Sequence, residues 1–415
     1  MARGEARSAP PGRRDAIDVA RVLALVIVVL GHLTIATVDR AGGKLRLANL
    51  LALRPHWAWA AGCAPMPVFF AAAGWANATA TVKTSVRRLQ TLVGLGAVVV
   101  ITWSIAAIVM TPATGRAGIA GDGARIATQP LWFLAAYVPF AANGGRLAWI
   151  ATDHIVLAVG GCLAALALFD LVRFGFGAPD WVGWPGFFLA WGTPWLAGAW
   201  WRARVGAVLW LAEARAGVAL FATAALAATG LVAFAGYSAP LIDAVPGARS
   251  NTTPPTLYTA VVALAQVGVL LIVAHGLDRA GRRWRAWWDR AGELAVGVYL
   301  WHLTALSFCV GLIAAGIPAP TRLTTSWWSL RPVWWCAVLV VTAGLIVLVA
   351  VIRSRLPRPS RLTARPFAAS TGIVVITFAA ALVGLRGPRS LPLALLCSLF
   401  FAGGWILLRV GSTTA

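Results

Sequence analysis

The sequence predicts an all-α protein that crosses a membrane many times. Of its 415 residues, 60% are hydrophobic and only 12% are charged, and the mean hydropathy is +0.80. A soluble domain carries about 25% charged residues. Apolar segments of about twenty residues, the length that a helix needs to span a bilayer, recur along the whole chain. We therefore expect a polytopic helix bundle in the cell inner or plasma membrane, surrounded by lipids.

Apolar length places twelve helices along the chain. Residues 1–14 are basic and rich in Pro, and we expect them to form a flexible cytoplasmic tail. The first apolar run is expected to remain a membrane helix, because no cleavage pattern of small residues follows it. The expected helices are 17–38, 57–80, 91–111, 131–142, 147–170, 184–201, 214–236, 255–275, 293–316, 333–352, 367–385 and 391–410.

We attribute the net charge of +22 to contacts with anionic lipid headgroups and to the orientation of the chain in the membrane, and we expect no nucleic acid as a partner. The basic residues are scattered over short loops between the apolar segments. Lys and Arg are more numerous in the segments that face the cytoplasm when the N-terminus is inside, so we expect both termini in the cytoplasm. Many of the 22 Trp fall near predicted helix ends, as aromatic belts at the membrane surfaces require.

The sequence contains no metal-binding or disulfide pattern. Its five cysteines are isolated within apolar segments, without a Cys-x-x-Cys spacing. It also lacks a phosphate-binding glycine loop, an HExxH motif, a nucleophile elbow and a pair of catalytic carboxylates. Chemistry is therefore expected from polar residues inside the membrane segments.

The first predicted helix carries Asp18, Arg21 and His32 in or beside its apolar run. A charge at mid-membrane costs about 2.5–3.5 kcal/mol on insertion scales, so such residues usually face the protein interior. Arg21 and His32 are eleven residues apart, which puts both on one stripe, about 16 Å apart along the helix axis. Asp18 lies one turn before Arg21 and can pair with it. The stripe indicates an anion anchor near the membrane surface and a proton acceptor deeper in. Alternatively, Asp18 and Arg21 anchor the helix end and His32 bonds a neighbouring helix.

Depth in the membrane separates the other histidines. His302 lies about nine residues into the ninth predicted helix, so we expect it about 13 Å from the cytoplasmic surface, compared with about 22 Å for His32. His56 and His275 fall at helix ends and are expected on the surface.

Two other stretches have two interpretations each. Asp153 and His154 form a polar pair in the fifth predicted helix. Either one of them lines a cavity, or the pair makes an interhelical hydrogen bond. Residues 276–292 interleave Arg and Trp, which favours an interfacial helix on the inner leaflet. The alternative is a basic rim that attracts a polyanionic donor.

Short motifs occur on four of the predicted helices. They are Arg-x10-His on the first (Arg21, His32), FFxxxG on the second (Phe69, Phe70, Gly74), LWFL on the fourth (131–134) and GELAVGVYLWH on the ninth (292–302). In this order the motifs resemble those of the integral-membrane acyltransferase family 3, over about residues 15–355. The resemblance is closest to actinobacterial members.

The resemblance implies a ten-helix bundle over 15–355, with 356–415 as two additional transmembrane helices. It also implies transfer of an acyl group, acetyl or another short acyl, from cytoplasmic acyl-CoA to a hydroxyl of a sugar, an envelope glycan or a natural product. The chain departs from the family at Ala73, where a Ser is common. It also has Lys83, Arg87 and Arg88 in place of an Arg-x-x-Arg.

The resemblance and the residue chemistry together give a set of expected site residues. Arginine suits the phosphates of acyl-CoA because its planar guanidinium binds phosphate with two hydrogen bonds. Imidazole suits a general base because it titrates near the working pH, and a transient acyl carrier is the alternative role. The expected residues are His32 and His302 for catalysis, Arg21, Arg87 and Arg88 for the donor, and Asp18 in support of Arg21, with no metal.

A protein of another class would use the same kinds of residue. A transporter or flippase of a lipid-linked sugar or small molecule also lines its path with intramembrane polar groups. The sequence shows no inverted repeat and no pair of broken helices, which such folds often carry. We therefore favour the enzyme.

Overall fold

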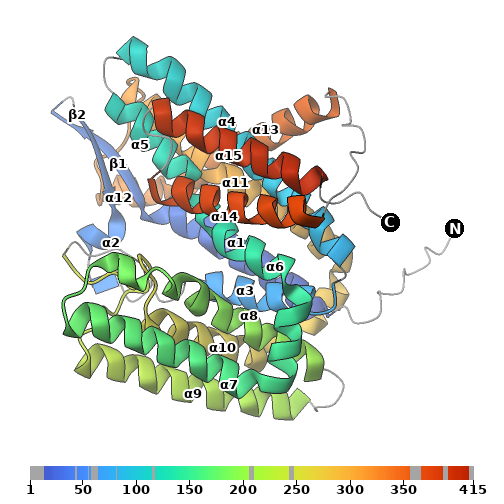
Figure 1. Ribbon diagram of the computed structural model, residues 1–415. Coiled ribbons are helices and arrows are strands. Elements are labelled where there is room, and N and C mark those ends of the chain that lie inside the picture. The colour runs from blue at the N-terminus through green and yellow to red at the C-terminus, as the bar shows by residue number, and fades with distance from the viewer. Residues whose placement is uncertain are drawn as a thin grey trace, which may run out of the picture.

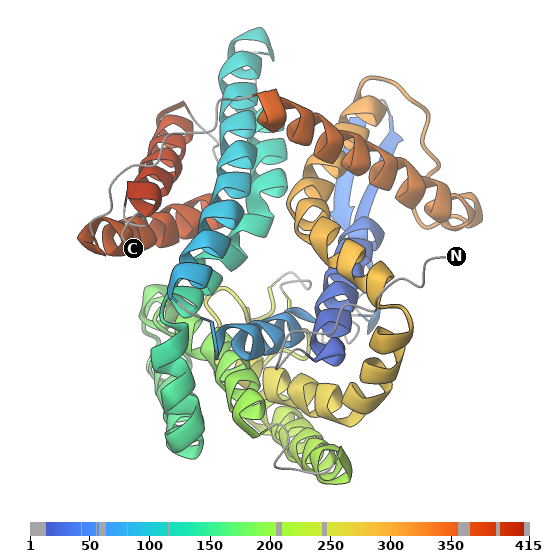
Figure 2. The same cartoon turned by 90° about the vertical axis from the view of Figure 1, so that its right-hand side faces the viewer.

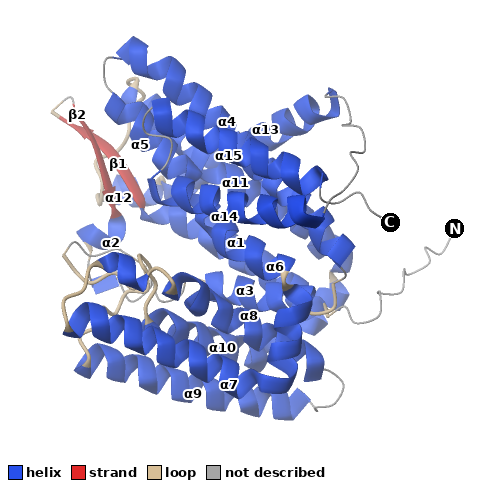
Figure 3. Cartoon of the chain, in the orientation of Figure 1, coloured by secondary structure: helices blue, strands red, loops and turns tan. Residues whose placement is uncertain are grey.

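The chain is helical almost throughout (Figure 3). The computed structural model describes residues 14–42, 44–54, 56–57, 64–80, 82–114, 117–204, 210–242, 247–355, 366–386 and 391–410. Seven helices within these residues are long and apolar enough to cross a membrane. The predicted fold class, an all-α polytopic membrane bundle, is confirmed.

Each of the twelve predicted segments overlaps a helix of the structure. The predicted start of the second helix, residues 58–63, lies outside the described residues. The twelve helices are α1 (Asp15–Ile35), α3 (Met66–Asn77), α4 (Val82–Thr114), α6 (Trp132–Ala142), α7 (Gly144–Asp170), α8 (Gly186–Arg204), α9 (Trp210–Phe234), α10 (Leu257–Arg283), α11 (Arg285–Ala314), α13 (Arg331–Arg355), α14 (Pro366–Arg386) and α15 (Leu391–Val410).

Helix α1 lies at the centre of the bundle. It packs against α3, α10 and α11 and touches α13. Helices α7 to α10 lie on one side of it, and α4, α14 and α15 lie on the other (Figure 1). Figure 2 shows the same two groups from the side on which α1 begins. Residues of α1 can therefore contact elements from both halves of the chain.

An antiparallel β-hairpin, which the sequence did not indicate, follows α1 directly. Its strands are β1 (Ala36–Ala41) and β2 (Lys44–Asn49), with Ala36 opposite Asn49 and Ala41 opposite Lys44. The first helix therefore ends at Ile35, three residues before its predicted end. A short helix, α2 (Leu50–Leu53), follows the hairpin. The hairpin covers the end of the bundle opposite the start of α1 (Figure 1).

A buried carboxylate fixes the hairpin. Asp39 is fully buried and accepts hydrogen bonds from Nε of Arg46 (2.9 Å) and from the backbone N–H of Arg322 (3.1 Å). Burial acts to raise the pKa of Asp39, but the hydrogen bonds and the positive charges of the two arginines outweigh it, so this pKa lies below its usual value.

Helix α5 (Ala117–Thr128) lies between two predicted helices, where no helix was predicted. It is too short to span a membrane, but it packs against α4, α11 and α14. Its Ala124 and Ala127 are fully buried in these contacts.

The predicted interfacial helix at 276–292 is wrong. Helix α10 continues to Arg283, and α11 begins at Arg285, so the stretch is divided between two membrane helices with a break at Trp284. Charged side chains fix this corner to the start of α1, as described below.

Helices α3 and α8 pack with their backbones in close approach at small residues. A Cβ on Gly74 would lie 1.9 Å from the carbonyl oxygen of Trp195, and one on Gly198 would lie 1.9 Å from that of Ala71. No side chain fits at either glycine without separating the helices. The contact positions α3, which carries Phe69 of the site described below.

Candidate functional site

The structure brings His32 of α1 and His302 of α11 into direct contact. Nδ1 of His32 lies 2.9 Å from Nε2 of His302, and the ring planes are nearly parallel, 15° apart, with centroids 5.1 Å apart. His302 is fully buried and His32 is half-buried. The two histidines predicted to be catalytic therefore form one pair.

The predicted difference in depth between the histidines is wrong. Helix α11 begins at Arg285, eight residues before its predicted start. Each histidine consequently lies 17 residues beyond the first residue of its helix, Asp15 in α1 and Arg285 in α11. This distance is about 26 Å along either axis, so both rings lie near the hairpin end of the bundle.

Hydrogen bonds define the tautomers of this pair. Nδ1 of His302 lies 2.7 Å from the carbonyl oxygen of Tyr299 and 3.2 Å from that of Val298. A carbonyl oxygen only accepts, so Nδ1 of His302 carries the proton and Nε2 of a neutral His302 is an acceptor. Nδ1–H of His32 then donates to it, which leaves Nε2 of a neutral His32 unprotonated. The arrangement makes His32 Nε2 a proton acceptor and holds its ring in place.

A chain of aromatic contacts leads from the pair through three of the recognised motifs. The Tyr299 ring lies 5.9 Å from that of His302, and its hydroxyl donates to the carbonyl oxygen of Pro130 at 3.1 Å. Phe133 packs edge-on against Tyr299 at 5.3 Å, and Phe69 packs edge-on against Phe133 at 5.5 Å. The motifs of α1, α3, α6 and α11 thus meet in one place. The motifs are far apart in the sequence, so the sequence alone does not reveal this contact.

Arg21 and Asp18 lie on the face of α1 that also carries His32. Their side chains approach to 3.9 Å and are 38% and 30% exposed. Leu25 and Val28, between Arg21 and His32 on the same stripe, pack in the main hydrophobic core. The opposite face of α1 is exposed at three apolar residues, Leu23, Val26 and Ile27. The stripe therefore faces the interior of the bundle.

The other predicted donor residues lie on α4. Arg88 is exposed, one turn and a half into this helix. Arg87 precedes it in α4, but its side chain lies outside the described residues. Both are at the end of α4 nearest to the start of α1 (Figure 1).

The remaining intramembrane pair takes no part in this arrangement. Asp153 and His154 are exposed on α7. His154 sits at a break in the helix with φ −135° and contacts Trp149 edge-on at 5.4 Å. His56 is exposed, as predicted, and His275 is half-buried and stacks on Trp210.

An ion cluster at the start of α1 was not predicted. Arg14 is 14% exposed and pairs with Glu213 of α9 and Asp278 of α10, each at 2.9 Å. Asp15 pairs with Arg285 of α11 at 2.7 Å. The cluster joins the ends of four helices and thereby sets the register of α1 against α11. The scarcity of acids, 13 in the whole chain, is a signal that could have drawn attention to these positions.

No group of three or more His, Cys, Asp or Glu that could hold a metal occurs in the part of the chain that the structure describes. The paired imidazoles therefore have no third ligand-type residue beside them among those positions. The arrangement suits proton transfer to and from Nε2 of His32.

Comparison with known proteins shows which family the chain belongs to. A family model described as an acyltransferase domain, that of acyltransferase family 3, matches residues 14–351. This span runs from Arg14 into α13 and leaves α14 and α15 outside it. No curated protein and no solved structure matches the chain. The chain belongs to acyltransferase family 3 and is a multi-pass membrane acyltransferase.

Proposed function

We propose that the protein transfers an acyl group, acetyl or another short acyl, from acyl-CoA to a hydroxyl of a sugar, an envelope glycan or a natural product. The observation that supports this proposal is the histidine pair, in which Nδ1 of His32 is held by His302 while Nε2 of His32 has no hydrogen-bond partner among the described residues. Activation of a hydroxyl requires a base that a neighbouring group holds in place and that can take the proton; here one imidazole nitrogen is held and the other can accept it. The family match supplies the reaction class.

In the proposed reaction His32 acts as the general base. Its Nε2 takes the proton of the acceptor hydroxyl while the hydroxyl oxygen attacks the thioester carbonyl. The tetrahedral intermediate collapses, the C–S bond breaks, and the CoA thiolate leaves with the proton from Nε2. A positioned base contributes about 10²–10⁴-fold to such a rate.

His302 acts in this proposal through His32. Neither ring nitrogen of His302 is available to contact the reacting groups, because Nδ1 faces backbone carbonyls and Nε2 faces His32. His302 is therefore a positioning residue. It fixes the tautomer of His32 and accepts a hydrogen bond from the imidazolium that forms, a role that an aspartate has in serine hydrolases.

The donor is proposed to bind from the cytoplasmic side. Arg21, held beside Asp18, lies eleven residues before His32 on one continuous helix, about 16 Å along its axis. An extended pantetheine arm separates the phosphates of acyl-CoA from the thioester by a distance of this order. Arg88 and Arg87 of α4 would add positive charge for the phosphates. In this arrangement both chain termini lie in the cytoplasm.

A deletion strain tests the function. Mass spectrometry of envelope glycans and secreted metabolites should show an acceptor that lacks only its acyl group. Wild-type protein should restore the group. His32→Ala at matched protein level should not, and the control His154→Ala, which removes an exposed histidine outside the pair, should restore it fully. Loss of a whole glycan or metabolite would instead indicate a transporter, and restoration by His32→Ala would remove His32 from the mechanism.

A further inference from the structure

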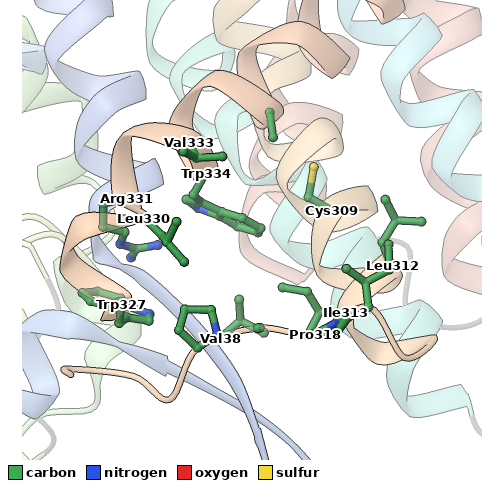
Figure 4. A pocket seen from close by; sticks show the side chains of 14 residues that line it. Val38, Cys309, Leu312, Ile313, Pro318, Trp327, Leu330, Arg331, Val333 and Trp334 are labelled. Carbon is green, nitrogen blue, oxygen red and sulfur yellow. The ribbon is translucent and has the colours of Figure 1, made fainter. Parts of the chain in front are cut away.

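A cavity of about 270 Å³ lies at the hairpin end of the bundle, apart from the histidine pair. Its walls come from α11 (Cys309, Ile313), α13 (Arg331, Trp334) and β1 (Val38), and they are almost entirely apolar (Figure 4). On α11 the cavity begins at Cys309, two turns beyond His302.

One wall residue, Arg331, carries a positive charge that no carboxylate of the described residues neutralises. Arg331 is 5% exposed, and its Nη2 donates to the carbonyl oxygens of Thr34 and Ala36, each at 2.7 Å. Its guanidinium lies over the ring of Trp327 at 3.8 Å. No carboxylate pairs with it among the described residues. By contrast, the buried Arg173 pairs with two aspartates.

An anionic occupant would neutralise this charge. A buried cation is normally paired, because an unpaired charge away from water is costly. Nε of Arg331 has no accessible surface, so an occupant of the cavity meets Arg331 at the small part of the residue that is exposed. The charge therefore calls for an anionic group with several acceptor oxygens.

The mouth of the cavity opens among apolar side chains. Ile317, Leu330 and Val333 line it and are 49%, 48% and 63% exposed. Trp328, next to the cavity wall in α12 (Thr325–Ser329), is also exposed. Exposed apolar residues beside Trp at the end of a membrane helix are typical of the boundary between hydrocarbon and headgroups. The occupant therefore enters from the lipid.

We propose that an anionic phospholipid binds here, with part of one acyl chain in the cavity and its phosphate oxygens on Arg331. The volume is below the roughly 300–1,000 Å³ of sites for drug-sized molecules, which suits one hydrocarbon chain and excludes a whole lipid. Arg331 is the first residue of α13, so its charge lies at headgroup level while the apolar walls extend beneath it. Guanidinium is well suited to phosphate oxygens.

Native mass spectrometry of the purified full-length protein tests the proposal. The protein is offered equal amounts of dioleoyl phosphatidylglycerol and dioleoyl phosphatidylcholine, and the retained adduct is counted. The wild type should retain one phosphatidylglycerol, with a preference of about tenfold or more. Arg331→Gln should weaken its retention about tenfold, the size expected for one charge-assisted contact. Arg249→Gln, which removes an exposed arginine elsewhere, should retain it.

A second variant keeps the test valid if Arg331→Gln does not fold. Ala337→Phe adds volume at an exposed alanine of the cavity wall and leaves the arginine intact, and it should also reduce phosphatidylglycerol retention. Equal retention by wild type, Arg331→Gln and Ala337→Phe would overturn the proposal. Equal retention of the two lipids would overturn it as well. Displacement of the lipid by millimolar inorganic phosphate would show a site for a free anion instead and would also contradict it.

Discussion

Replacing His302 by Ala tests whether the second histidine works by orienting the first. In the wild type, Nε2 of His302 accepts from Nδ1 of His32 at 2.9 Å. The variant removes this acceptor, so the tautomer of His32 with a free Nε2 is no longer enforced. Because a general base contributes about 10²–10⁴-fold, we expect kcat to fall about 10²-fold, or about 2.7 kcal/mol of barrier. The KM for acyl-CoA should change little, since the donor residues are untouched.

The assay is the release of CoA thiol by purified protein, with kcat and KM determined separately. His302→Gln should recover part of kcat because its amide oxygen can accept the same hydrogen bond. Leu303→Ala is the matched control: Leu303 is the next residue on α11 and 2% exposed, and such truncations cost about 2–5 kcal/mol of stability. Unchanged kcat in His302→Ala would refute the orienting role. An equal loss in Leu303→Ala would assign the effect to destabilisation.

Three further predictions concern stability. Gly74→Ala should lower the Tm, because its Cβ would lie 1.9 Å from a carbonyl oxygen of α8 and overpacking costs about 1–3 kcal/mol. The control Gly160→Ala should leave the Tm unchanged, because the space around Gly160 is open. The pKa of Asp39 is lowered in the folded state, so its stabilisation is present at neutral pH and lost as the pH falls below the usual carboxyl range. The Tm difference between wild type and Asp39→Asn should therefore be largest at pH 7 and shrink toward pH 3, and a constant difference would contradict this. Arg14→Gln should lower the Tm, because it leaves Glu213 and Asp278 without their partner; the expected loss of stability is about 2 kcal/mol for a partly exposed cluster. The control Arg146→Gln, at an exposed arginine, should leave the Tm unchanged. Equal Tm values for wild type and Arg14→Gln would show that the cluster does not hold the helix ends.

The helices were predictable because membrane spans are set by apolar length. All twelve segments were found, whereas the hairpin and α5 were missed. Residues 36–38 of the hairpin continue the first apolar run without a proline, and what ends the helix before them is the pairing of 36–41 with 44–49. Helix α5 has twelve residues, too few to register as a span, and its place depends on packing against helices distant in sequence.

The histidines of the site were predictable one by one, but their contact was not. An ionisable group in an apolar run indicates a role inside the bundle, and this found both His32 and His302. Their common depth depends on where α11 begins, which the ion pair between Arg285 and Asp15 sets across 270 residues of chain. Likewise, nothing in the sequence distinguishes the buried Arg331 from other arginines at helix ends, because the carbonyls that hold it belong to the end of α1.

The most direct test of the central claim is acyl transfer by purified protein in lipid, followed as the consumption of labelled acyl-CoA with a hydroxyl acceptor present. We predict that wild type and His154→Ala release CoA at equal rates. His32→Ala should be slower by about 10²–10⁴-fold while still binding the donor. Equal rates for wild type and His32→Ala would show that Nε2 of His32 is not the base in the transfer.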